Sequence, residues 1–241
     1  GHGVGSDGVA AVNIVAPVYQ VFSGIGLMLG AGCSVAVSIH VARQKTKVAR
    51  MNLTQALLFS TVLTAMICMV VMLFPEYSVR LLGSSDTLLP QASDYLFWIM
   101  PSFMFQMWSF IGLFIIRLDG APNVAMWCNI ISSLMNAVLD WVMIFPLGWG
   151  VRGAAIATSI SIMFGGIIAM SYLLFFAKTL RPIVLKSSWK SLRLSLRNIG
   201  YHCRIGSPSL FGEMTLAVLI FMGNQMFMRY LGDDGVAAFG I

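Results

Sequence analysis

Long apolar runs dominate this sequence and limit what the chain can fold into. A helix that crosses a membrane needs about 20 predominantly apolar residues, and runs of that length recur from Val9 to the end of the chain. Only 10% of the residues are charged, whereas a soluble domain has roughly 25%. The composition excludes a soluble enzyme, a disordered tail and a disulfide-stabilised secreted domain. It predicts an all-α integral membrane protein.

Six complete spans are predicted, and a seventh begins near Gly235. Turns rich in Gly, Pro and Asp separate most of them, and the predicted spans are residues 9–42, 52–74, 95–116, 124–145, 154–177 and about 206–228. With loop 43–50 in the cytoplasm, 12 of the 15 Lys and Arg residues lie on that side, a strong positive-inside bias. The net charge of +6 is then explained by the orientation of the spans in the membrane, so no nucleic-acid partner is expected. We expect a multi-pass protein of the inner or plasma membrane, surrounded by lipids, with loop 43–50 and segment 178–204 cytoplasmic.

Segment 178–204 is the one long polar connection. Apolar residues recur on one helical face and Lys and Arg on another, which predicts an amphipathic helix on the cytoplasmic membrane surface; a solvated linker helix is the alternative. Either way, the segment joins a first lobe at 1–177 to the start of a second lobe at 205–241.

A repeated sequence indicates how the spans are organised. Residues 5–14 read GSDGVAAVNI and residues 232–241 read GDDGVAAFGI, so seven of ten positions agree. Six spans separate the two copies, which gives both the same orientation, as in a parallel repeat, and predicts a parent of about 454 residues with twelve helices in two lobes. The chain is therefore expected to start just after a first helix.

Asp140 and Glu213 are the two acidic residues within the predicted spans. A carboxylate there is costly, about 2.5–3.5 kcal/mol, and usually faces the bundle interior and has a function. Asn136 shares a helix face with Asp140. Thr158 is expected in the next span at a depth similar to that of Asp140, so that the two residues can meet across the helix pair. Their oxygens suit Na⁺, and the carboxylate can equally carry a proton. The alternative is that Asp140 is a structural hydrogen-bonding group between the two helices.

Four further side chains are candidates for substrate or proton coupling. Glu213 can carry a proton or pair with a cationic drug; an interfacial or capping Glu is the alternative. Tyr19, Gln20 and Gln106 are candidates for lining a cavity, because aromatic faces attract organic cations; packing or lipid contact is the alternative. No catalytic constellation or phosphate-binding motif occurs, so we expect no enzyme activity and no cofactor beyond a coupling ion.

Several segments resemble the multidrug and toxic-compound extrusion (MATE) transporters, which share a superfamily with lipid and oligosaccharide flippases. They are LLGSSDTLLPQASDYL at 81–96, RLDGAPNVAMWCNIISSLMNAVLDWVMIF at 117–145, GWGVRGAAIATSIS at 148–161 and GDDGVAAFGI at 232–241. Together they resemble helices 2 to 7 of the family and the start of helix 8. The resemblance implies a monomeric secondary antiporter with a V-shaped cavity between two six-helix lobes, which expels organic cations in exchange for Na⁺ or H⁺.

The resemblance also implies roles for the site residues. In the family branch with a cation site in the first lobe, Asn136, Asp140 and Thr158 match the motif positions, and a further carboxylate comes from helix 1. Some branches have a coupling glutamate in helix 7, similar to Glu213. The alternative is a flippase for a lipid-linked precursor. Because the predicted spans contain two acids and no Lys or Arg, an electronegative cavity and cationic cargo are favoured.

Overall fold

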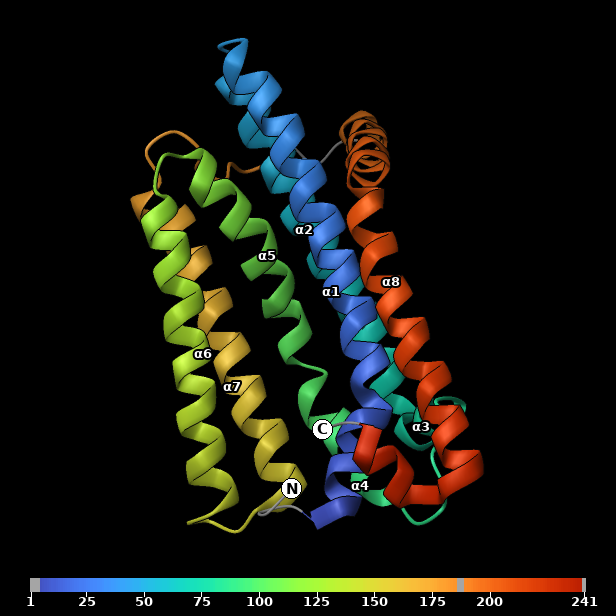
Figure 1. The fold of residues 1–241 in the computed structure, drawn as a ribbon. Helices are drawn as coiled ribbons and strands as arrows, with labels where there is room; N and C mark the ends of the chain where they lie inside the picture. The colour runs from blue at the N-terminus through green and yellow to red at the C-terminus, as the bar shows by residue number, and fades with distance from the viewer. Residues whose placement is uncertain (1–4, 186–188, 240–241) are drawn as a thin grey trace.

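The computed structural model describes residues 5–185 and 189–239, and within these ranges all regular structure is helical (Figure 1). The long helices are α1 (Gly5–Ala42), α2 (Thr46–Leu73), α6 (Pro122–Ile144), α7 (Gly150–Ser171) and α8 (Trp189–Phe239). The shorter elements are α3 (Pro75–Leu81), α4 (Leu89–Ile99), α5 (Ser102–Leu118) and the π-helical turn η1 (Tyr172–Phe176).

The helices confirm the predicted membrane fold. Within the described residues, five helices are long and apolar enough to span a membrane, and α4 with α5 forms a sixth, bent by 50°. The bend was not predicted for span 95–116. It follows from Pro101, which lacks an N–H group to continue the helix, so that α4 ends at Ile99 and α5 begins at Ser102. The segments expected in the cytoplasm, 43–50 and 177–185, lie at the same end of the bundle (Figure 1).

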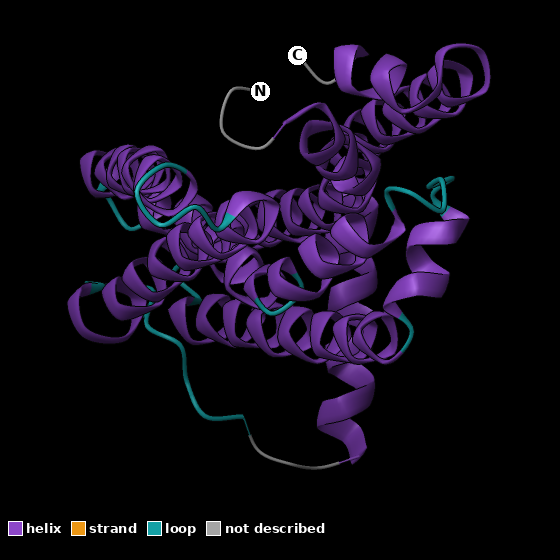
Figure 2. Ribbon diagram, turned by 90° about the horizontal axis from the view of Figure 1, so that it is seen from below, coloured by secondary structure: helices purple, strands orange, loops and turns teal. Residues whose placement is uncertain are grey.

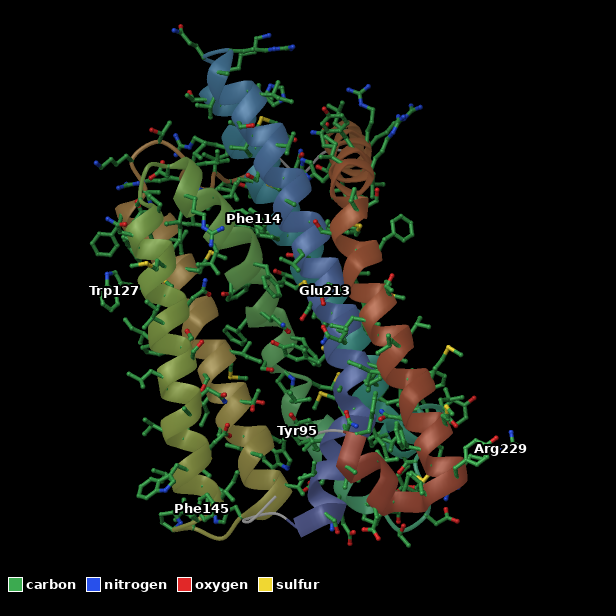
Figure 3. All side chains as sticks on the ribbon, viewed as in Figure 1. Tyr95, Phe114, Trp127, Phe145, Glu213 and Arg229 are labelled. Carbon is green, nitrogen blue, oxygen red and sulfur yellow. The ribbon has the colours of Figure 1, made fainter. Side chains whose placement is uncertain are left out.

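Helix α6 has one apolar face and one polar face. Its large exposed side chains lie along one side and include Trp127, Ile130, Leu134, Val138 and Trp141. Trp127 points away from the bundle in Figure 3. Asn129, Ser133, Asn136 and Asp140 recur every three or four residues and therefore share another side, next to α7, on which α6 packs. The apolar face of α6 is therefore available to lipid, and the polar face, with the Asp140 carboxylate, is turned toward the bundle.

The described part of segment 178–204 is helical only from Trp189 onward. Residues 177–185 have no regular structure, and α8 runs from Trp189 past residue 204 without interruption. No proline occurs in α8 before Pro208, so nothing strongly ends the helix where the second lobe was expected to begin. Residues 186–188 and the side chains of 189–192, which contributed to the predicted amphipathic face, lie outside the described residues. In the described part, the linker continues directly into a spanning helix.

The two copies of the repeated sequence share one backbone feature. Gly5 has φ 75° and Gly232 has φ 67°, a conformation that residues with a side chain rarely adopt. Gly5 begins α1, and Gly232 is the non-helical residue that breaks α8. Each glycine therefore introduces a new helical segment. Figure 2 shows the start of α1 and the last turns of α8 on the same side of the bundle.

Candidate functional site

A cavity of about 480 Å³ lies among α1, α4, α5, α6 and α7. Hydroxyl, amide, aromatic and aliphatic side chains line it, and the described lining contains no charged residue. Five of the seven predicted site residues lie on this surface: Tyr19, Gln20, Gln106, Asn136 and Thr158. The fold thus brings together residues that are up to 139 positions apart in the sequence.

Asn136 and Thr158 meet across the α6–α7 pair, whereas the sequence placed Thr158 at the depth of Asp140, one helical turn further along α6. Nδ2 of Asn136 donates a hydrogen bond to Oγ1 of Thr158 at 3.4 Å, which is long for such a bond and therefore weak. Both residues are half-buried. The pair places one amide oxygen and one hydroxyl oxygen beside the cavity.

Asp140 lies one helical turn beyond Asn136 and outside the cavity lining. Its side chain is half-buried, yet Oδ1 is buried and has no hydrogen-bond partner within the described residues. A buried carboxylate oxygen without a partner costs free energy. Oδ1 therefore forms no bond that would join α6 to another described helix.

Tyr95 completes this group, and the sequence analysis missed it. The side chain is 8% exposed, lines the cavity from α4, and places its hydroxyl beside Thr158 and within electrostatic range of Asp140. Figure 3 shows Tyr95 where α4 faces the interior. A signal was present in the sequence: Pro101 marks a break in this span, and a break changes which side chains point inward.

Gln106 contributes an unpaired acceptor on the other side of the cavity. It is 4% exposed, and its Nε2 donates to Oγ of Ser23 at 3.0 Å, which ties α5 to α1. Its Oε1 is buried and has no partner within the described residues. Tyr19 lies nearby on α1, with its ring centroid 6.1 Å from that of Phe103.

Glu213 is not part of this group. It lies on α8 and does not line the cavity, and Figure 3 places it nearer the cytoplasmic end than Tyr95. A Cβ atom added to Gly24 would lie 3.0 Å from Cβ of Glu213, so the two helices approach closely there. The carboxylate is within electrostatic range of Tyr19. Tyr19, which lines the cavity, is thus one link between Glu213 and the cavity.

Two buried carboxylate or amide oxygens at or beside the cavity have no described donor. Oδ1 of Asp140 and Oε1 of Gln106 are buried acceptors with no described partner, and no cationic side chain faces them from the described lining. Within the part of the chain that the structure describes, no three His, Cys, Asp or Glu side chains gather as a metal site. The chemistry offered is that of one carboxylate with neutral oxygens, which suits a monovalent cation or a proton.

Comparisons with known proteins agree with this architecture. The MatE family model matches residues 1–142. The multidrug export protein MepA of Staphylococcus aureus is 24% identical over 238 residues, which cover 97% of this chain and 50% of MepA. An FAD transporter of Shewanella oneidensis is 28% identical over 251 residues, covering 98% of this chain and 52% of the transporter. The chain spans about half the length of the curated relatives it matches.

Solved structures show the same fold. The inward-facing conformation of a multidrug resistance MATE family transporter of the MOP superfamily matches with a TM-score of 0.87 and 25% identity, over 99% of this chain and 53% of that one. The outward-facing conformation of a multidrug resistance MATE family transporter matches with a TM-score of 0.81 and 26% identity, over 98% of this chain and 52% of that one.

Proposed function

Because this chain belongs to the MatE family of multidrug efflux transporters, we propose that the full-length protein carrying it exports organic cations in exchange for Na⁺ or H⁺. The observation that supports this proposal is the pair of unpaired acceptor oxygens, on Asp140 and Gln106, beside a cavity whose described lining has no positive charge. A cation satisfies such oxygens, whereas an anion does not.

In this proposal, different residues bind the coupling ion and the organic cation. Asp140, Asn136 and Thr158 hold the coupling ion, with Tyr95 next to them. Tyr19, Gln20 and Gln106 contact the organic cation, since aromatic rings attract cations. When Asp140 binds the coupling ion, the negative charge of the carboxylate is neutralised. When the ion has left, the charged carboxylate attracts the organic cation. Release of the ion to the cytoplasm restores the charged state, which couples export to the gradient.

Glu213 has a separate role in this proposal. It lies on α8, away from Asp140, and interacts electrostatically with Tyr19. Tyr19 in turn lines the cavity. We assign Glu213 as a counter-ion or proton carrier that acts on the cargo side of the cavity.

The flippase alternative is not favoured. An anionic phosphate headgroup requires Lys or Arg side chains to neutralise it, and the described cavity lining has neither. The relative named as an FAD transporter makes an anionic cargo worth testing directly.

The experiment is an efflux assay with the full-length protein in proteoliposomes. A fluorescent organic cation, FAD and a lipid-linked precursor are each followed under a Na⁺ gradient and then a pH gradient. We expect gradient-driven movement of the organic cation, and the effective gradient identifies the coupling ion. Movement of FAD or the lipid-linked precursor without movement of the cation would contradict the proposal.

A further inference from the structure

The break between α4 and α5 leaves backbone carbonyl groups without helical partners. Around a 50° bend the normal bonding ladder is interrupted, and in a membrane each freed carbonyl needs another donor. Three side chains donate to carbonyls at the bend: Oγ of Ser159 to that of Trp98 at 2.8 Å, Oγ of Ser102 to that of Ile99 at 2.7 Å, and Sγ of Cys68 to that of Met100 at 3.2 Å. The carbonyl of Met100 also accepts the backbone N–H of Phe103 at 3.2 Å.

Ser159 differs from the other two donors because it is adjacent to the candidate ion site. It is 5% exposed and follows Thr158 directly in α7. Its acceptor, Trp98, lies three residues after Tyr95 in α4, which is about one helical turn. A single hydrogen bond therefore fixes the end of α4 against α7 at the level where Tyr95 meets Thr158.

A second contact between the same two helices holds the Trp98 side chain. The guanidinium carbon of Arg152, also on α7, lies 4.7 Å from the centroid of the Trp98 ring, a cation–π geometry. On the other side, Nε1 of Trp98 donates to Oδ1 of Asp94 at 3.2 Å. Trp98 is thus held by α7 through its backbone and its ring. The end of α4 is a fixed element beside the site.

We propose that Ser159 is a positioning residue for the coupling-ion site. Its hydroxyl does not touch the ion; it holds α4 so that the Tyr95 hydroxyl stays beside Thr158. This inference rests on the proposed function, because it assumes that these residues bind the coupling ion. Loss of one such hydrogen bond weakens ion binding roughly fivefold, from the typical worth of a hydrogen bond, and leaves the maximal rate at saturating ion close to that of wild type.

The test measures efflux of the fluorescent cation by the full-length protein as a function of coupling-ion concentration. Ser159→Ala removes the hydroxyl, and Ser159→Thr keeps it as a rescue. The control is Ser60→Ala: Ser60 is fully buried in α2, and its hydroxyl bonds only to the carbonyl of Leu57 in its own helix, at 2.9 Å. We expect the half-saturating ion concentration to rise roughly fivefold in Ser159→Ala only.

Each outcome decides the proposal. An unshifted half-saturating concentration in Ser159→Ala overturns it, as does an equal shift in Ser60→Ala or a failure of Ser159→Thr to restore the wild-type value. If Ser159→Ala does not reach the membrane, Ser159→Cys, a weaker donor, takes its place with a smaller shift expected, and no shift again overturns it. Asp140→Asn is measured alongside: if it retains coupled efflux, the proposed function fails, independently of Ser159.

Discussion

Asn13 and Asn224 hold each other across 211 residues of sequence. Nδ2 of Asn13 donates to Oδ1 of Asn224 at 3.0 Å, and Nδ2 of Asn224 donates to the backbone carbonyl of Asn13 at 2.8 Å. Asn13 also donates to the carbonyl of Val236 at 3.2 Å. The two asparagines therefore join α1 both to α8 and to the second copy of the repeated sequence.

This asparagine pair gives a stability prediction. Asn224→Leu removes both bonds and leaves the Asn13 amide with only its bond to the carbonyl of Val236, so we expect the free energy of unfolding to fall by about 1–2 kcal/mol, given what polar contacts between membrane helices are worth. Thermal unfolding in detergent measures it. The control is Thr215→Val in the same helix, where the hydroxyl bonds only to the carbonyl of Phe211 at 2.8 Å. Equal losses in both variants would contradict the prediction.

A second prediction concerns the outer loop at Gly83. Its φ is 88°, and an added Cβ would overlap the amide of Gln225, which donates to the carbonyl of Leu82 at 3.2 Å. Gly83→Ala therefore carries both backbone strain and a collision. Gly120→Ala is the matched control, because Gly120 has φ 89° with nothing within 4 Å.

We expect both alanine variants to lose roughly 1 kcal/mol from the positive φ. Gly83→Ala is expected to lose about 1 kcal/mol more, because the end of the Gln225 side chain must move away and give up its hydrogen bond to the carbonyl of Leu82. Melting temperatures in detergent compare them, and the idea is wrong if Gly120→Ala is the less stable of the two.

Alanine substitutions at two neighbouring glycines of α7 are expected to have different effects. An added Cβ at Gly165 would meet Oγ of Ser132 at 2.7 Å, a hydroxyl that can rotate away, on the cavity surface. At Gly166 it would meet the backbone carbonyl of Phe105 at 2.3 Å, which cannot move without shifting α5.

Gly165→Ala is therefore expected to raise the KM for the organic cation with little loss of folded protein. Gly166→Ala is expected to destabilise the fold by about 1–3 kcal/mol, as overpacked cores do. Size-exclusion yield and efflux kinetics separate the two effects. Loss of folded protein in Gly165→Ala, with Gly166→Ala folding normally, would contradict this prediction.

Asp119 holds the start of the linker. Oδ1 accepts the backbone N–H groups of Thr179 at 2.9 Å and Leu180 at 3.0 Å, and Oδ2 accepts that of Lys178 at 2.7 Å. Asp119→Ala leaves all three donors unpaired, whereas Asp119→Asn retains one acceptor oxygen. We expect tryptic cleavage after Lys178 to accelerate severalfold in Asp119→Ala and less in Asp119→Asn, because hydrogen bonds to a charged group are worth about 1.5–3 kcal/mol. Identical cleavage rates in all three proteins would contradict this role.

The parts of the fold that sequence predicts well are those set by one helix at a time. The faces of α6 follow from the spacing of Asn136 and Asp140, because a regular helix places residues four apart on one side. The position of Thr158 beside the polar face of α6 followed from its depth in the neighbouring span, although it bonds to Asn136 and not to Asp140, at whose depth it was predicted. Both relationships depend only on helix geometry and on the depth of each residue in its span.

The parts that sequence did not predict depend on where a helix breaks or continues. Tyr95 reaches the site because α4 stops before Pro101, and a span treated as one straight helix hides that change in direction. The sequence treated 178–204 as a separate segment, whereas its helical part is continuous with the spanning part of α8. Glu213 was predicted to take part in coupling because it is a carboxylate within a span and because the resemblance implies a glutamate in helix 7, while its position depends on how α8 packs on Gly24.

The central claim is that the Asp140 carboxylate couples ion entry to cation export. The most direct measurement is efflux of a fluorescent organic cation from proteoliposomes under the effective gradient, comparing wild type with Asp140→Asn. Asp94→Asn is the control, since Asp94 bonds to Trp98 but does not line the cavity. The account predicts gradient-driven efflux in wild type and Asp94→Asn and its loss in Asp140→Asn, with the protein still folded. Coupled efflux at the wild-type rate in Asp140→Asn would contradict the account.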